Sequence, residues 1–309
     1  MTRIATLTLN PTIDVAFEIE RVSPTDKMRT DVERSCPGGG GINVARVFNR
    51  LGGTAHCYYL SGGALGAGFD GLVAQQGLEA TRIAIAHETR IALAVLERAS
   101  GREYRFTPRG PHVDEREWRE CLDVIAGADC RYFVASGSLP RGVPADFYAR
   151  VARIMRARSI PMVLDTSGDA LREGLAEGGL MLVKPSHREF QELVGRDLET
   201  PEEYCEEAAA IVGAGQCDMI AVTMGDGGAV LASKDGALHL PAIAIEAHSA
   251  VGAGDSFVAA MVHALGDGWA SADAFRYGMA AGAAAVLTPG TALAFVVDIE
   301  RLYCRLKGG

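Results

Sequence analysis

The chain has 309 residues, of which 48% are hydrophobic and 22% are charged, and its formal net charge is −9. This length and composition are typical of a globular protein with a sizeable core, folded as one large α/β domain or as two smaller ones. The acidic balance argues against a protein that binds duplex nucleic acid or an anionic membrane surface.

Seven cysteines are spread through the chain, and none belongs to a C-x-x-C pair. An odd number without metal-binding spacing is typical of reduced thiols and not of a disulfide framework or a zinc site. The first residues, MTRIATLTLNPTID, lack the apolar segment of a signal peptide, and no apolar run is long enough to span a membrane. These features predict a cytoplasmic protein.

Short apolar runs alternate with segments of helical spacing through most of the chain. The apolar runs predict buried parallel strands at residues 4–9, 55–60, 131–136, 161–165, 180–184 and 219–223. Helices are predicted at residues 41–51, 114–125, 145–158, 169–177, 187–194 and 201–213, and the chain from Gly254 onward is mostly helical. This alternation predicts an α/β fold with a doubly wound, mostly parallel sheet and helices on both faces.

Two regions alternate apolar and polar residues instead, as half-buried antiparallel strands do. The first holds residues 15–20 and 27–33, and the second holds residues 90–97 and 103–107, which a hairpin turn joins. We expect these strands to form a small β lid over the carboxyl edge of the main sheet, where open α/β folds bind ligands. Residues 1–309 are therefore predicted to be one domain, with a lid drawn from about 15–33 and 90–107.

The segment CPGGGGINVARV, residues 36–47, places four glycines directly before a predicted helix. Each glycine loses more backbone entropy on folding than any other residue, so something must require bare backbone here. Close approach of a ligand to the unpaired N–H groups of the helix would require it, and a flexible turn is the alternative. The chain has no Gly-Lys-Ser/Thr sequence, which excludes a P-loop. A G-x-G-x-x-G pattern at residues 66–71 is too weak alone to indicate a dinucleotide site.

A second glycine loop, Gly252-Ala253-Gly254, precedes Asp255 and an apolar helix. Several backbone N–H groups converge at such a helix start, and the helix dipole favours negative charge there, so the loop predicts an anion hole. The carboxylate of Asp255 is then either an N-cap or a base aimed at a reacting hydroxyl group.

Three motifs closely resemble those of the ribokinase-like carbohydrate kinases, the PfkB family, and they occur in the family's order. They are GGGGINVAR (38–46), KPSHRE (184–189) and VGAGDSF (251–257). The resemblance covers essentially the whole chain and implies the ribokinase-like fold, with ATP as phosphate donor and Mg²⁺ as metal. Within the family, TLTLNPTID (6–14) and VASGSLPRGV (134–143) resemble the branch that acts on phosphorylated ketoses.

The resemblance also narrows the substrate. Branch members that act on fructose 1-phosphate or tagatose 6-phosphate usually carry Gly-Gly-Lys-Gly in the early loop, and Gly40 replaces that lysine here. The implied reaction is ATP-dependent conversion of fructose 6-phosphate to fructose 1,6-bisphosphate, with tagatose-6-phosphate kinase and 1-phosphofructokinase as alternatives. A sugar-phosphate sensor without turnover is the alternative of a different class, and the presence of Asp255 and its glycine loop disfavours it.

Roles for single residues follow from the same resemblance. Asp255 matches the catalytic base, and the anion hole is matched by Gly252, Ala253 and Gly254. The sugar, its phosphate and the lid are matched by Asp14, Lys27, Gly39, Asn43, Arg90, Arg105 and Ser138. The ATP side is matched by Lys184, Ser186, Thr223, Gly225, Gly228, Gly282 and Ala283. Glu189 matches the acidic residue that organises Mg²⁺ through water. A monovalent-cation loop, with K⁺ as the candidate ion, is matched by Ser249, Val251, Ala285, Thr288 and Gly290.

Three positions depart from the family pattern. Ser186 stands where the family's Asn-x-x-Glu motif begins, and serine lacks the amide. Ser249-Ala250 replaces the usual Asp-Thr before the anion hole, and Ala292 stands where the branch often carries arginine. Backbone carbonyl groups supply most ligands of such a cation loop, so the side-chain changes need not abolish it.

The predicted lid carries an apolar face, formed by Val15, Phe17, Ile19, Ile91, Leu93 and Val95. A small sheet that stands off the core cannot bury such a face alone, and its edges would invite pairing. Two lids packed face to face in a homodimer would cover it, and the resemblance implies the same arrangement. A lid folded onto its own domain is the alternative.

Overall fold

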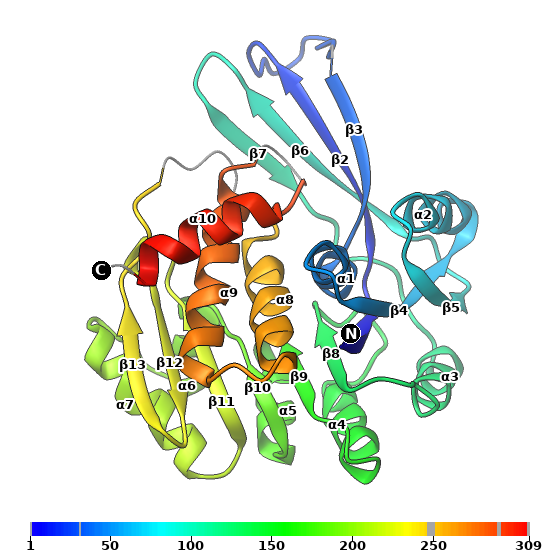
Figure 1. Ribbon diagram of the computed structural model, residues 1–309. Helices are drawn as coiled ribbons and strands as arrows, with labels where there is room; N and C mark the ends of the chain where they lie inside the picture. The colour runs from blue at the N-terminus through cyan, green and yellow to red at the C-terminus, as the bar shows by residue number, and fades with distance from the viewer. Residues whose placement is uncertain (1, 31, 246–250, 289–291, 308–309) are drawn as a thin grey trace.

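A computed structural model describes residues 2–30, 32–245, 251–288 and 292–307, and its main element is a nine-stranded sheet (Figure 1). The strand order is β13-β12-β11-β10-β9-β8-β1-β4-β5. The strands are β1 (Arg3–Thr8), β4 (Thr54–Gly62), β5 (Glu79–Ile85), β8 (Tyr132–Ser136), β9 (Met162–Asp165), β10 (Leu180–Val183), β11 (Cys217–Thr223), β12 (Ala229–Ser233) and β13 (Gly236–Leu240). The strands from β5 to β11 pair in parallel, and β12 pairs antiparallel with both of its neighbours.

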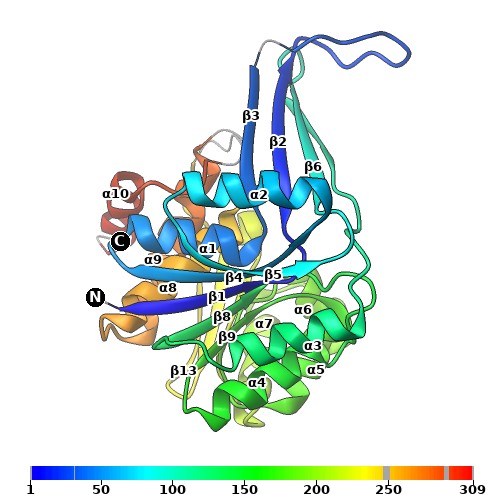
Figure 2. The same cartoon turned by 90° about the vertical axis from the view of Figure 1, so that its right-hand side faces the viewer.

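Helices cover both faces of this sheet and bury a core on each side (Figure 2). One face carries α1 (Gly40–Arg50), α2 (Gly63–Gln75), α8 (Ala253–Gly266), α9 (Ser271–Val286) and α10 (Val296–Lys307). The other face carries α3 (Glu115–Ile125), α4 (Phe147–Ala157), α5 (Gly168–Glu177), α6 (His187–Val194) and α7 (Pro201–Gly213). The predicted doubly wound α/β fold, its six core strands and its helices are confirmed.

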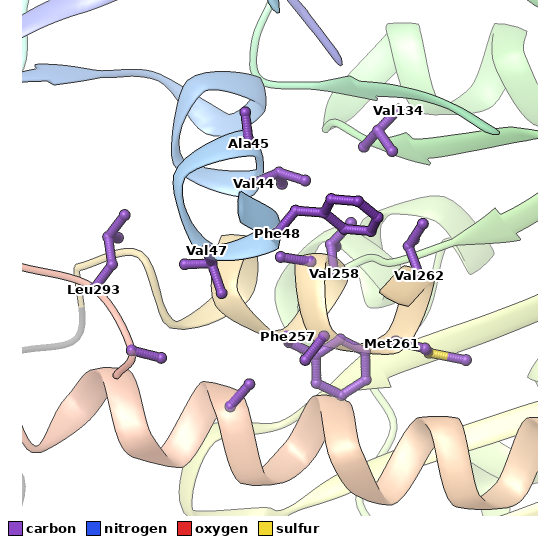
Figure 3. Close-up of a cluster of buried hydrophobic side chains, with 14 of the residues drawn as sticks. Val44, Ala45, Val47, Phe48, Val134, Phe257, Val258, Met261, Val262 and Leu293 are labelled. Carbon is purple, nitrogen blue, oxygen red and sulfur yellow. The ribbon is translucent and has the colours of Figure 1, made fainter. Parts of the chain in front are cut away.

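The two helices that follow the glycine loops pack against each other. Figure 3 shows Val44 and Phe48 of α1 pointing toward Val258 and Val262 of α8, and all four side chains are fully buried. Burial of large apolar side chains contributes about 1.5–3 kcal/mol each, so this contact fixes the two helix starts relative to each other. The glycine loops therefore meet at one place on the carboxyl edge of the sheet.

Four elements of the main body were not predicted from the sequence: α2, β5, β12 and β13. The G-x-G-x-x-G pattern of residues 66–71 lies inside α2. These glycines have helical backbone and do not form a strand-to-helix turn, so the pattern is not a dinucleotide loop. Strands β12 and β13 form a hairpin at the sheet edge, where the antiparallel pairing departs from the parallel order.

A second, four-stranded sheet forms the lid, with the order β3-β2-β6-β7. Its strands are β2 (Thr12–Ile19), β3 (Val32–Gly38), β6 (Arg90–Glu97) and β7 (Arg102–Phe106). The prediction of a strand at 27–33 was wrong, because β3 pairs with β2 in a register that runs from Thr12↔Gly38 to Glu18↔Val32. Part of the glycine-rich segment thus belongs to an edge strand, where proline is tolerated.

The lid is also not wholly antiparallel. Strand β6 pairs with β2 in parallel, while β3 and β7 pair antiparallel with their neighbours. Strand β6 follows a crossover through β4, α2 and β5, and a parallel neighbour requires such a crossover. The predicted hairpin between β6 and β7 is confirmed.

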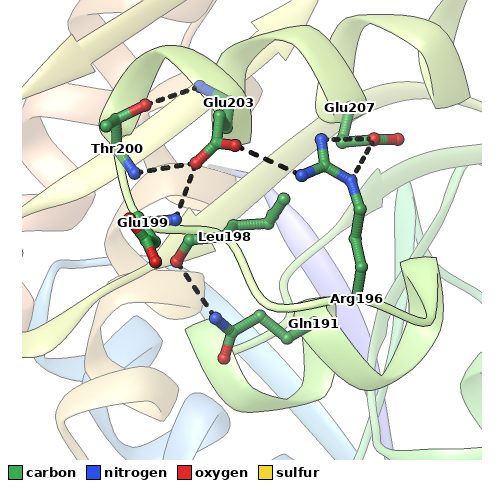
Figure 4. Close-up of polar contacts among 7 residues, drawn as sticks. All are labelled: Gln191, Arg196, Leu198, Glu199, Thr200, Glu203 and Glu207. Atoms are coloured by element: carbon green, nitrogen blue, oxygen red, sulfur yellow. Dashed lines mark hydrogen bonds and ion pairs between the residues drawn. The ribbon is translucent and has the colours of Figure 1, made fainter.

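Polar contacts join the loop that follows α6 to the first turns of α7 (Figure 4). The Thr200 hydroxyl accepts from the Glu203 N–H, and the Glu203 carboxylate accepts from the N–H groups of Glu199 and Thr200. Arg196 donates to Glu203 and Glu207 at 3.2 and 2.9 Å. This capping box fixes the start of α7, and a replacement of such a cap costs about 1 kcal/mol.

None of the helices in the described part of the chain has the length and apolar character that a membrane span requires.

Candidate active site

A pocket of about 200 Å³ lies between the lid and the carboxyl edge of the main sheet. Strands β2, β6 and β7 form its upper wall, and the starts of α1 and α8 form its floor. The polar lining comes from Thr12, Asp14, Asn43, Arg90, Arg105, Thr107 and Asp255, and the backbone lining includes Gly39, Gly40, Val251 and Gly252. Both glycine loops and both arginines singled out in the sequence therefore meet here.

The four early glycines are required by the protein's own packing around the pocket. A Cβ atom on Gly40 would lie 2.1 Å from the Ser136 hydroxyl oxygen, and one on Gly38 would lie 2.0 Å from the Asp14 carboxylate. Gly39 has a φ of +114°, which side chains disfavour, and its backbone lines the pocket. The glycines let the side chains of Asp14 and Ser136 lie against bare backbone, so the alternative of a flexible turn does not apply.

Asp255 lies in the first turn of α8 and forms part of the pocket floor. The N-cap of this helix is Gly252, so the carboxylate is not the cap. Its Oδ2 accepts a hydrogen bond of 2.9 Å from Nδ2 of Asn43. Burial and the charge of Asp165 raise the pKa of Asp255 to about 7, although Asn43 and Lys184 partly oppose the shift. A carboxylate with such a pKa can accept a proton near neutral pH, as a general base does.

Lys184 lies beside the second glycine loop. Its Nζ forms an ion pair of 3.0 Å with Asp165, and Ser136 donates to the same carboxylate at 3.1 Å. A Cβ atom on Gly254 would lie 3.2 Å from this Nζ, so the ammonium group reaches the start of α8. Burial lowers the pKa of Lys184, but the nearby carboxylates outweigh burial and raise it, so the side chain stays cationic. A fixed cation and the helix start together suit a phosphate group.

At the lid end of the pocket the two arginines differ in their contacts. Arg90 donates to the carbonyl oxygens of Asn10 and Pro108 at 2.8 and 2.7 Å, which ties β6 to the neighbouring loops. The side chain of Arg105 makes no hydrogen bond to the described residues and remains exposed at the pocket wall. Burial raises the pKa of Asp14 to about 6, and Arg90 and Arg105 partly oppose this shift. A polyol hydroxyl and an anion are therefore the groups that this end of the pocket can bind.

Two predicted sugar-site residues lie outside the pocket lining. The segment between β2 and β3 extends beyond the end of the lid (Figure 2). Lys27 belongs to this segment and is exposed, because β3 starts only at Val32. Ser138 accepts a hydrogen bond of 3.2 Å from Asn10 and is exposed.

The predicted ATP-side residues lie along the ends of β10 and β11 and on α9. Ser186 caps α6, and the Glu189 carboxylate accepts from the Ser186 N–H at 2.7 Å. Ser186 also bridges to Thr223 at the end of β11. Gly225 and Gly228 bound the turn η1 (Gly225–Gly227), and Gly282 and Ala283 lie in α9, where Gly282 faces the Ala253 carbonyl. The serine at position 186 is therefore a helix cap, as its residue type favours.

The predicted monovalent-cation loop is described only in part. Ser249, Ala250 and Gly290 lie outside the described residues, and Val251 lines the pocket. The Thr288 hydroxyl donates to the Ala285 carbonyl at 2.7 Å. Arg50 donates to the carbonyl oxygens of Ala292 and Ala294 at 2.8 and 3.0 Å, so a guanidinium group from α1 holds the segment where the branch often has its own arginine.

Sequence reasoning missed two charged groups of the site. Asp165 ends β9 at the same sheet edge as Lys184, and this position after an apolar strand was the signal available for it. Arg46 lies one turn after Asn43 in α1 and is only 6% exposed. An arginine at that spacing is commonly a surface residue, so its burial could not be predicted.

A half-buried carboxylate at a helix start, a nearby ammonium group and a lid wall with two arginines suit the transfer of a phosphoryl group to a hydroxyl group. The family model of the pfkB family carbohydrate kinases matches residues 7–297, and the chain belongs to this family.

Two similar proteins and one solved structure support this family assignment. ATP-dependent 6-phosphofructokinase isozyme 2 of Mycobacterium tuberculosis is 42% identical over 303 residues, which cover 97% of this chain and 89% of that protein. The Escherichia coli protein of the same name is 36% identical over 311 residues, covering 99% of this chain and all of that one. The crystal structure of Escherichia coli phosphofructokinase-2 in complex with potassium superposes with a TM-score of 0.94 at 35% identity, covering 99% and 100% of the two chains.

Proposed function

We propose that this carbohydrate kinase transfers the γ-phosphoryl group of ATP to fructose 6-phosphate and forms fructose 1,6-bisphosphate. The observation that carries the proposal is the hydrogen-bonded pair of Asn43 and Asp255 at the start of α8, below a lid wall that holds Arg105. The names of the relatives, and Gly40 in place of a lysine, support fructose 6-phosphate over tagatose 6-phosphate and fructose 1-phosphate.

In the proposed reaction, Asp255 accepts the proton of the sugar's primary hydroxyl group while the oxygen attacks the γ-phosphorus. The bond from the γ-phosphorus to the bridging oxygen of the β-phosphate breaks, and ADP leaves. The N–H groups at residues 252–255 and the ammonium group of Lys184 stabilise the negative charge on the transferred group. Asn43 and Asp14 orient the sugar hydroxyl groups, and Arg105 binds its phosphate. Closure of the lid would exclude water.

Mg²⁺ and a monovalent cation are part of the proposal. The chemistry of the donor set fits Mg²⁺, since this ion is commonly held by one or two carboxylates together with substrate phosphates, and Asp165 and Glu189 lie on the ATP side. Bound Mg²⁺ would neutralise charge on the phosphates. K⁺ fits the carbonyl-rich segment around Ala285 and Thr288, and the potassium complex of the Escherichia coli protein supports this choice.

A coupled assay for ADP release tests the function directly. We expect turnover with fructose 6-phosphate to exceed that with tagatose 6-phosphate, fructose 1-phosphate and free fructose. If tagatose 6-phosphate or fructose 1-phosphate is turned over faster, that sugar phosphate is the substrate and fructose 6-phosphate is not. ATP binding without ADP release on any of them would instead favour the sugar-phosphate sensor.

Arg105→Ala is expected to raise KM for fructose 6-phosphate by roughly 10- to 100-fold, because a charge-assisted hydrogen bond is worth about 1.5–3 kcal/mol. KM for ATP should remain unchanged. Arg102→Ala is the matched control, since Arg102 lies on the same strand but outside the pocket lining. An equal rise in KM for free fructose would show that Arg105 does not recognise the phosphate.

The lid also supports a proposal about assembly. Its face divides into two halves: Val15 and Ile91 pack against the main core, whereas Leu93 and Phe106, which are paired across strands, are 36% and 58% exposed. Phe17 is paired with Val95 on the same outer half. We infer that two copies cover this outer half in a homodimer that works in the cytoplasm.

Phe17→Asp is expected to convert this dimer into a monomer, because a carboxylate on the covered face would lose its hydration. KM for fructose 6-phosphate should rise as well, since β2 carries both Phe17 and Asp14. Light scattering and steady-state kinetics are the measurements. Val297→Asp, on an exposed residue of α10, should change neither. A monomeric wild type would refute the interface, and a fully active monomeric variant would refute its link to the site.

A further inference from the structure

Arg46 is a buried cation directly behind the pocket, and it does not belong to the pocket lining. Its NH1 donates to the side-chain Oδ1 of Asn43 at 3.3 Å, and its Nε donates to Oε1 of Gln76 at 3.2 Å. The guanidinium group also lies beside the Cys36 thiol of β3 and near the Asp14 carboxylate of β2. A buried arginine therefore contacts residues of the lid, the early helix and the segment after α2.

The contact with Asn43 gives the amide a direction. A side-chain amide has one oxygen that accepts and one nitrogen that donates, whereas a guanidinium group only donates. Arg46 can therefore pair only with the amide oxygen, and this leaves the nitrogen to face the pocket. That nitrogen donates to Asp255 at 2.9 Å. With the amide rotated by half a turn, its oxygen would face the carboxylate and its nitrogen would face the cation.

We propose that Arg46 is a positioning residue that fixes the amide of Asn43 so that its nitrogen faces the carboxylate of Asp255. The inference rests on the proposed kinase function, because Asp255 is the base only in that reaction. Arg46 acts through Asn43 and touches neither the sugar nor the nucleotide. The hydrogen bonds therefore run in one direction, from Arg46 as donor through Asn43 to the Asp255 carboxylate as acceptor.

The geometry also explains why the residue is an arginine. Its planar fork reaches Asn43 and Gln76 from two different nitrogens at the same time. A lysine ammonium group is a compact charge on a flexible stem, and it cannot hold both oxygens in one fixed plane. The anchor at Gln76 keeps the fork from rotating away from Asn43.

A double-mutant cycle tests the proposal on the full-length protein. Arg46→Met is expected to lower kcat with fructose 6-phosphate by about 10- to 100-fold, as loss of an orienting partner commonly does, while KM for ATP is unchanged. In the Asn43→Ala background the same change should lower kcat by less than about threefold, because there is no amide to orient. Asn49→Ala is the control, since Asn49 lies near the end of α1 and its side-chain oxygen accepts from the Ala55 N–H at 2.8 Å.

Each outcome is decisive. Equal losses in both backgrounds would mean that Arg46 serves folding alone, and wild-type kcat in Arg46→Met would refute the proposal outright. If Arg46→Met does not fold, Arg46→Lys carries the test, with at least a threefold lower kcat expected in the wild-type background and no loss with Asn43→Ala. Turnover by the wild-type protein is measured first, so failure of the proposed function is seen separately, and the cycle is then run with whichever sugar phosphate is consumed.

Discussion

Replacement of Asp255 by asparagine is expected to lower kcat by about 10²- to 10⁴-fold, the usual cost of losing a general base. Asparagine has nearly the same shape and can still meet Asn43, but it cannot accept the proton of the sugar hydroxyl group. ATP affinity should persist, because the N–H groups at the start of α8 are unchanged. The measurements are ADP release under saturating substrates and equilibrium binding of ATP.

Asp267→Asn is the matched control for this variant, since Asp267 lies at the other end of α8. It should retain full activity. A kcat close to that of the wild type in Asp255→Asn would mean that proton transfer does not depend on this carboxylate. The assignment of Asp255 as the base would then be wrong.

The pH dependence of the wild type should carry the same information. Asp255 has a raised pKa of about 7, so it is protonated, and unable to act as a base, when the pH falls below that value. We therefore expect kcat to fall as pH decreases through about 7 and to level off above it. Asp14, with a pKa of about 6, should add a further loss of sugar binding at lower pH.

Lys184→Met is expected to have the second-largest effect, with kcat lowered by about 10²- to 10³-fold, because a fixed charge at the transferring phosphoryl group is lost. It should also destabilise the protein by about 3–5 kcal/mol, since the buried carboxylate of Asp165 loses its partner. Steady-state kinetics and thermal denaturation separate these two losses.

The double variant Lys184→Met with Asp165→Asn makes the separation sharper. It removes the unpaired charge, so stability should largely return, while turnover should not. Lys234→Met, on an exposed turn, is the control for replacement of a lysine by methionine. Recovery of kcat together with stability in the double variant would show that Lys184 acts only through folding.

The sequence predicted the main sheet well because its buried strands are continuous apolar runs, as in β8 and β10. It predicted the lid less well. The residues KMRTDVE at 27–33 alternate like a strand, yet pairing with β2 decides the register, and the strand begins at Val32. Helix α2 was missed because its glycine-rich sequence has low helix propensity and is stabilised by packing of Phe69 and Val73 on the core.

The candidate site could likewise be predicted only in part from the sequence. Asn43 and Asp255 each stand in a compact glycine motif before a predicted helix, so each motif could be picked out from the sequence. That the two motifs meet depends on the packing of α1 against α8, and the ion pair of Lys184 with Asp165 likewise depends on a tertiary contact that spacing does not encode. Residue type alone did not predict the contacts of Arg90. Its guanidinium N–H groups donate to backbone carbonyl groups of neighbouring loops.

A single residue, Gly39, separates the last residue of β3 from the first residue of α1. Glycine rotates more freely about its backbone bonds than any other residue, so this joint can absorb rotation of the lid. Val44 and Phe48 of α1 are fully buried against α8, and this packing holds the helix that carries Asn43 in place beside Asp255. We therefore expect closure of the lid over a sugar to leave the hydrogen bond between Asn43 and Asp255 intact.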